Sequence, residues 1–338
     1  MEPVSEAFTA RRPARTPPAL IAATAVFGAI VVLAVAVVGM NWRRDHAAAA
    51  RQGWTARLVA VFRPPTEGLS NVLTGLQEWR SGAKASPEMA RELDGAIAAY
   101  SPLPHNVEAL PPHEARPRYA AAARLYLEFL RLERAAADLP AGPLRAQADL
   151  MARRVNLLAD RVFDRGRVAA DPSVFDQPPP GEGEIRFPND VPDWAAEGLA
   201  AGPPLADDPP ASPVGDRPVR RSRPQQTEAG WRQALAQAGI PSSAEVQRAI
   251  TARHAPALAQ LAAAFEAGAG RLHQAADPRN GRERAATLVL GVLVQGEAAR
   301  AALADVAAGA VPGPLDASAR RLAAVGAALR SVAADPSA

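Results

Sequence analysis

Hydrophobic residues recur at helical spacing along most of this chain, and near the N-terminus the polar residues between them almost vanish. Residues Ala19 to Met40 read ALIAATAVFGAIVVLAVAVVGM, a run of 22 residues without a charged side chain. A helix of this length spans about 33 Å, close to the ~30 Å hydrocarbon thickness of a bilayer. Arginines lie on both sides and Trp42 follows directly, as at a membrane–water boundary. We therefore expect residues 19–40 to form a transmembrane helix rather than a buried core helix.

This apolar run exceeds the ~7–15 residues typical of a cleaved signal peptide, so we expect an uncleaved signal anchor. Residues 1–18 form a polar tail with four prolines, and we expect this tail to be disordered. The arginines on the two flanks are nearly balanced, so the positive-inside rule does not choose an orientation. We favour a single-pass protein of the cell membrane with an extracytoplasmic body, because a short basic tail before one early anchor is a common bacterial arrangement.

A first helical region is predicted over residues 41–169. The triplet Ser86-Pro87-Glu88 is a helix start signal, with a capping hydroxyl, proline in the first turn and an early carboxylate. Residues 101–117 are rich in proline and are predicted to be a loop. One apolar face after the start signal comprises Met89, Leu93, Ile97 and Tyr100.

The last helix of this region has the clearest packing pattern. Its apolar residues follow alternating steps of four and three, which predicts a heptad seam covered by an antiparallel neighbour across a short loop. The seam comprises Leu144, Ala148, Met151, Val155, Leu158 and Val162. Arg153, Arg154 and Asp160 fall off this stripe, so we expect them on a solvated face.

Residues 170–225 have a different composition and are predicted to be a Pro-rich linker. Of the 33 prolines in the chain, 13 lie between Asp171 and Pro224. Such a segment buries too little apolar surface to offset the entropy of ordering it. Within it, Phe187 to Leu199 is either a short helix that docks on a neighbouring bundle or a linear recognition motif.

A second helical region is predicted over residues 226–335. Ser242 and Glu245 form a capping box, and Pro256 is expected to kink or restart the following helix. Residues 285–294, AATLVLGVLV, are apolar all round but too short to span a bilayer, so we expect a central buried helix. A last seam follows Gly313-Pro314 and comprises Leu315, Ser318, Leu322, Val325, Leu329 and Val332.

The two regions resemble each other. Gly142-Pro143-Leu144 and Gly313-Pro314-Leu315 each open a heptad helix, and a Leu-rich helix with a central acidic residue, Glu133 or Glu297, precedes each. The similarity fits a duplicated helical unit, but at this level of similarity we favour two separate bundles built by the same packing rules.

Composition points to an all-α protein. Hydrophobic residues make up 48% of the 338 residues but aromatic residues only 5%, so Ala, Leu and Val supply most of the packing. Lys84 is the only lysine among 38 basic residues, and the arginine and alanine bias is typical of a bacterial genome rich in G and C. The absence of cysteine excludes disulfides, thiolate catalysis and Cys-ligated metals.

The charge distribution argues against a nucleic-acid partner. The pI is about 9.9, but 35 acidic residues interleave with the basic ones and leave a formal net charge of +3. Nucleic-acid binding requires a concentrated positive face. The one tight basic cluster outside the anchor, Arg217 to Arg223, lies in the Pro-rich linker and is typical of a solvated charge run.

No catalytic, cofactor-binding or metal-ligating residues can be assigned from motifs. The histidines, His46, His105, His113, His254 and His273, include no pair at helical ligand spacing. His113 lies in the proline-rich stretch, where a solvated side chain is expected. Glu297 is the one carboxylate on a nearly apolar helix, and Arg300 three residues on predicts a structural ion pair. We therefore expect no enzyme and no cofactor.

These observations favour a non-enzymatic, membrane-anchored helical protein of the bacterial envelope that acts as a protein-interaction or scaffolding module. The alternative is an extracytoplasmic sensory domain that binds a small ligand between helices. A concave pocket with convergent polar groups would favour the sensor. Small-residue pairs in the anchor, Thr24 with Gly28 and Ala25 with Ala29, would also allow a homo-oligomer.

Overall fold

Helices make up almost all of the part of the chain that the structure describes. This computed structural model describes residues 53–65, 68–69, 71–170, 228–273, 282–309 and 312–334. These ranges contain no strand, so the prediction of an all-α fold is confirmed for them. The predicted tail (1–18), anchor (19–40) and nearly all of the linker (170–225) lie outside the described residues.

The helices fall into two sets along the chain. Unlabelled helices at 53–65 and 71–80 come first. They precede α2 (Ser86–Tyr100), α3 (Leu103–Glu108), α4 (Arg116–Asp138) and α5 (Pro143–Ala170). The second set comprises α7 (Glu228–Gln237), α8 (Ser243–Ala252), α9 (Ala255–His273), α10 (Arg282–Ala307) and α11 (Asp316–Ala334).

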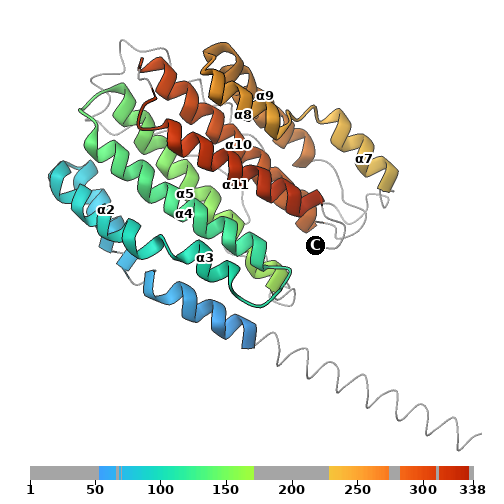
Figure 1. Cartoon of the computed structure of the whole chain (residues 1–338), viewed down its shortest axis with the longest axis horizontal. Coiled ribbons are helices and arrows are strands. Elements are labelled where there is room, and N and C mark those ends of the chain that lie inside the picture. The colour runs from blue at the N-terminus through green and yellow to red at the C-terminus, as the bar shows by residue number, and fades with distance from the viewer. Residues whose placement is uncertain are drawn as a thin grey trace, which may run out of the picture. The chain divides into compact units, whose positions relative to one another are not determined.

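Two helical hairpins form the centre of this arrangement (Figure 1). A short loop joins α4 to α5 and another joins α10 to α11. The contacts between the hairpins are reciprocal, since α5 packs on α10 and α11 packs on α4. Helices α2 and α3 contact α4, while α9 packs on α10 and α8 on α11. The second helix of each hairpin therefore covers the first helix of the other.

One hydrophobic cluster runs through both sets of helices. It includes Trp54 and Leu158 from the first set and Phe265 and Leu329 from the second. The chain from Trp54 onward accordingly forms one compact unit, distinct from Met1–Gly53. The two helical regions thus share a core, while the boundaries predicted for the domains and linker remain predictions.

The prediction of the seam on α5 is confirmed, and the prediction of its solvated face is right for Asp160 but wrong for Arg154. Met151, Val155 and Leu158 are buried, as expected. Arg154, however, is only 4% exposed, because α10 covers that side of α5. Asp160 is exposed, as expected, and its carboxylate accepts a hydrogen bond from the Tyr126 hydroxyl at 2.6 Å. The side of α5 that reads as polar is therefore also used for packing, through paired charges and hydrogen bonds.

Two local predictions also need correction. Residues 101–117 are not one loop, because they contain α3 and the first residues of α4. Both helices have proline in the first turn, where the missing N–H costs no hydrogen bond. The N-cap of α2 is Ala85 rather than Ser86. The Ser86 hydroxyl instead accepts hydrogen bonds from Trp79 Nε1 and Arg145 Nη2, both at 3.0 Å.

The only lysine, Lys84, lies in a small hollow over Gly75. Its ammonium group contacts Glu92 Oε1 at 2.8 Å and Glu78 Oε2 at 3.1 Å. A Cβ atom at residue 75 would collide with the Glu92 carboxylate, so glycine makes room for the cluster. A compact ammonium with three donors suits this site better than a planar guanidinium.

Only one of the described helices is long and apolar enough to cross a membrane, Arg284–Ala307 within α10, and most of it is buried inside the protein. This agrees with the central buried helix expected at residues 285–294, although α10 continues well beyond that stretch.

Candidate functional site

A sharp corner between α8 and α9 shapes an open hollow in the described part of the chain. Helix α8 begins with the predicted capping box, in which Glu245 N–H donates to Ser242 Oγ and Ser242 N–H donates to Glu245 Oε2. It ends at Arg253, whose φ of 50° turns the chain into the left-handed region. Helix α9 restarts at Ala255 with Pro256 in its first turn, so the predicted break at Pro256 is confirmed.

A buried carboxylate holds this corner against the central hairpin. Arg253 Nη1 lies 2.9 Å from Asp305 Oδ2 on α10, and Asp305 is fully buried. Asp305 also accepts hydrogen bonds from the backbone N–H groups of Gly313 and Leu315, at 2.9 and 3.1 Å. One side chain thus fixes both the α8–α9 corner and the loop that leads to α11.

The other end of the hollow is held by arginines that bind backbone carbonyls. Arg271 Nη2 donates to Ala238 O at 2.6 Å, and Arg330 Nη1 donates to Pro241 O at 2.8 Å. Between these two carbonyls, Gly239 takes a φ of 58°, which glycine adopts without strain. These contacts position residues 239–241 as the end wall of the hollow.

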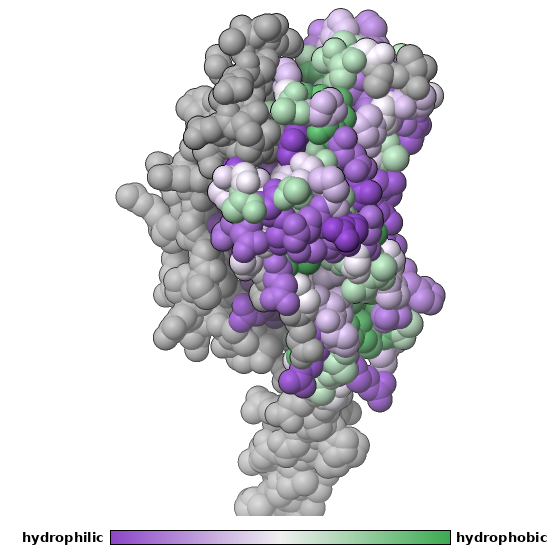
Figure 2. All heavy atoms as spheres, turned by 90° about the vertical axis from the view of Figure 1, so that its left-hand side faces the viewer, coloured by the Kyte–Doolittle hydropathy of each residue, from purple (hydrophilic) through white to green (hydrophobic). Residues whose placement is uncertain are grey.

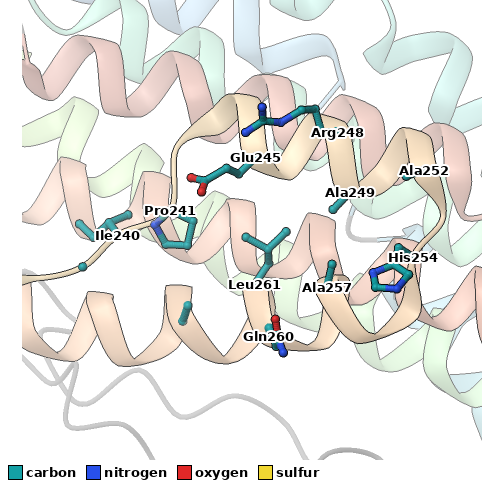
Figure 3. A pocket seen from close by; sticks show the side chains of 12 residues that line it. Ile240, Pro241, Glu245, Arg248, Ala249, Ala252, His254, Ala257, Gln260 and Leu261 are labelled. Atoms are coloured by element: carbon teal, nitrogen blue, oxygen red, sulfur yellow. The ribbon is translucent and has the colours of Figure 1, made fainter.

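We call this hollow the α8–α9 groove. Its volume is about 680 Å³, and it is open to solvent along its length (Figure 3). The side chains of Ala249, Ala257 and Leu261 point into the gap between the helices, while Arg248 points away from it. The groove is lined by Gly239, Ile240, Pro241, Glu245, Arg248, Ala249, Ala252, His254, Ala257, Gln260, Leu261 and Ala264.

The polar groups of the groove lie at its rim. Arg248, His254 and Gln260 are exposed to solvent. The Glu245 carboxylate is used by the helix cap, and the Ser242 backbone N–H lowers its pKa. The floor consists of alanine, leucine, isoleucine and proline. Such a surface can bury an apolar helix face but offers few groups to orient a small polar ligand.

The histidines do not come together in the described residues. His105 lies on α3 and His254 on the groove rim, while His46 is outside the described range. His113 is not simply solvated, because its ring stacks on Trp54 with centroids 4.2 Å apart and burial lowers its pKa. Its Nδ1 atom accepts the Ala115 N–H at 3.1 Å. The described residues contain no group of three or more His, Cys, Asp or Glu that could hold a metal ion.

Glu297 belongs to an ion-pair network between helices. Its Oε1 atom lies 3.0 Å from Arg154 Nη2 on α5 and 3.6 Å from Arg300 Nε. The predicted pair with Arg300 is therefore present, but Arg154 is the nearer partner. Arg300 also binds Glu266 on α9 at 2.6 Å, and burial raises the pKa of Glu266. The network joins three helices and provides packing rather than an open reaction site.

A second such pair supports the reciprocal contact of the hairpins. Arg321 on α11 lies 2.6 Å from Glu128 Oε1 on α4, as Arg154 on α5 binds Glu297 on α10. The suggested equivalence of Glu133 and Glu297 is not supported by their contacts, because Glu133 binds Arg80 from helix 71–80 instead.

Sequence reasoning did not find the groove, because its floor depends mainly on alanine. Alanine is found both in cores and on surfaces, so its position in the sequence gives no signal. Figure 2 shows one face of the molecule on which hydrophilic residues predominate and hydrophobic residues form only small, separate patches.

Comparisons with protein-family models, curated proteins and solved structures found no match to this chain.

Proposed function

We propose that this chain is a non-enzymatic, membrane-anchored protein-interaction module of the bacterial envelope, and that it receives an apolar helix face of a partner protein in the α8–α9 groove. The observation that carries the proposal is the groove itself, with its apolar floor, open length and polar rim. Grooves of this kind accommodate amphipathic helices through anchors at helical spacing.

The fixed walls of the groove support this reading. Asp305 holds the corner, and Arg271 and Arg330 hold the end wall, so the groove is formed before a partner arrives. A preformed site saves the cost of ordering loops on binding. The charged residues inside the bundle are paired between helices, which suits a structural role better than a catalytic one.

A small-ligand sensor is less well supported. The volume of the groove falls within the range of ligand pockets, about 300–1,000 Å³, but such pockets enclose most of the ligand and contain convergent polar groups. The groove is open, and its polar side chains lie at the edge. The proposal takes residues 19–40 as the membrane anchor, and the length and apolar composition of that stretch support this part of it.

Photo-crosslinking in intact membranes tests the proposed function. A photoreactive residue replaces Gln260, which is exposed at the rim. We expect a crosslinked protein band, which Ala252→Arg abolishes because the new side chain occupies the groove. Ala259→Arg is the matched control, because Ala259 is an exposed alanine on α9 outside the lining. A band that survives Ala252→Arg, or no band at all, would contradict the proposal.

A further inference from the structure

A cluster of buried charges lies far from the groove in the sequence, where helix 71–80 meets the α4–α5 hairpin. Arg80, the last residue of that helix, reaches between α4 and α5. Its Nη2 atom lies 2.5 Å from Glu133 Oε1, and its Nε atom lies 2.7 Å from Asp149 Oδ1. Both carboxylate side chains are completely buried. One guanidinium therefore bridges two carboxylates from different helices.

The two carboxylates are not equally well satisfied. The second oxygen of Asp149 accepts a hydrogen bond from Arg153 Nε at 3.1 Å. The second oxygen of Glu133, Oε2, is buried and has no hydrogen-bond partner among the described residues. A buried carboxylate oxygen without a donor is costly, and the cost disappears if the group takes up a proton.

The surroundings of Glu133 also favour its protonated form. Burial raises its pKa well above the ordinary value, and the negative charge of Asp149 raises it further. The positive charges of Arg80 and Arg153 oppose this shift without cancelling it. Of the other charged groups nearby, Arg145 on α5 stacks on Trp79 and binds Ser86 at the start of α2.

The next residue of α4 is paired separately. Arg134 binds Asp94 of α2 at 2.8 Å, with both side chains partly exposed. This pair joins α2 to α4 at a position that solvent reaches. Solvent screens its charges, so the pair has little effect on Glu133.

We propose that Glu133 takes up and releases a proton, and that this proton sets how firmly helix 71–80 and the turn after it are held against the α4–α5 hairpin. With the proton on Oε2, the repulsion between the two carboxylates is removed. Arg80 then keeps its ion pair with Asp149 and its hydrogen bond to Glu133 Oε1. Without the proton, two buried negative charges share the bridge and the contact loosens.

The direction of the pH effect follows from linkage. A carboxyl group with a raised pKa in the folded state binds more protons when folded than when unfolded, over the pH range between the two values. The attachment is therefore strongest on the acid side and weakens as pH rises above the ordinary range of glutamate. This device does not depend on the proposed role of the groove.

Hydrogen exchange of the full chain tests this device between pH 5 and 8, with rates corrected for intrinsic exchange. We expect the protection of backbone amides in residues 71–84 to fall as pH rises, by at most about tenfold per pH unit, the limit for one proton. Glu133→Gln keeps an oxygen for Arg80 and cannot ionise, so its protection should not change with pH. Glu88→Gln, at an exposed glutamate on α2, is the matched control and should keep the wild-type profile.

Two results would overturn the proposal. One is a wild-type profile that is flat or that loses protection on acidification. The other is a Glu133→Gln protein that keeps the wild-type pH dependence. If Glu133→Gln does not fold, the wild-type profile is compared with that of Glu266→Gln, because burial also raises the pKa of Glu266. A fall in protection that persists in Glu266→Gln supports the proposal, and one that disappears in Glu266→Gln overturns it.

Discussion

The ion pair between Arg154 and Glu297 is expected to make the two helical regions unfold as one. It joins α5 to α10, and the two side chains are only 5% and 3% exposed. We consider Arg154→Met, which removes the guanidinium but keeps an unbranched apolar side chain of similar reach. Within the described part of the chain, Glu297 then retains the 3.6 Å contact with Arg300, which is itself engaged with Glu266.

The expected magnitude follows from the distance and the burial. At the 3.0 Å separation of this pair, and with an effective dielectric constant near 20, the attraction is about 5 kcal/mol. In the wild type, the cost of taking both ions out of water offsets most of that attraction. Removal of Arg154 alone leaves the cost for Glu297, so the free energy of unfolding should fall by roughly 3–5 kcal/mol. The double variant Arg154→Met/Glu297→Leu buries neither ion and should lie close to the wild type.

Urea unfolding of residues 45–338, followed by far-UV circular dichroism and tryptophan fluorescence, measures this difference. We expect coincident transitions for the two probes in the wild type. A loss of less than about 1 kcal/mol for Arg154→Met would refute the buried pair. A double variant as unstable as the single one would show that the lost stability comes from packing, and two separate transitions would show that the regions are independent.

Three further predictions follow from the packing and the anchor. Leu158→Ala should lower the free energy of unfolding by roughly 2–5 kcal/mol, because Leu158 is completely buried, while the exposed Arg57→Ala should change it by less than about 0.5 kcal/mol in the same urea assay. Gly326→Ala should lower the free energy of unfolding by about 1–3 kcal/mol, since its Cβ would lie 2.8 Å from the Gly291 carbonyl oxygen. Gly95→Ala has open space around its Cβ and should stabilise the protein in thermal unfolding. An alkaline phosphatase fusion to the C-terminus should be active and a green fluorescent protein fusion dark, whereas the opposite pair of results would place the body in the cytoplasm.

The sequence predicted the helices well where apolar spacing and caps coincide. The seam from Met151 to Leu158 and the capping box at Ser242 are present as expected. Both are local features, because helix period and cap chemistry depend on residues within a few turns.

Contacts between distant helices could not be predicted in the same way. Arg154 has the sequence signature of a solvated residue, and its burial depends on Glu297, 143 residues further along the chain. The groove depends on the corner between α8 and α9 at Arg253. Arg253 adopts a left-handed backbone conformation, and no residue pattern in the sequence predicts it. The stem of an arginine can pack along apolar surface when a carboxylate binds its guanidinium group. The polarity of an arginine in the sequence therefore does not by itself predict an exposed position.

The hollow that holds Lys84 also has a chemical consequence. Lys84 carries the only side-chain primary amine of the chain, so an acylating reagent has one lysine to modify. Hydrogen bonding to Glu92 raises the pKa of this amine, and an ammonium group must lose its proton before it can attack. Acylation of this amine should therefore be slower than that of a solvated lysine, and it should speed up whenever Glu78 and Glu92 move away from the ammonium group. A single mass-spectrometric time course of one modified peptide would then follow the opening of this corner of the protein, without any engineered label.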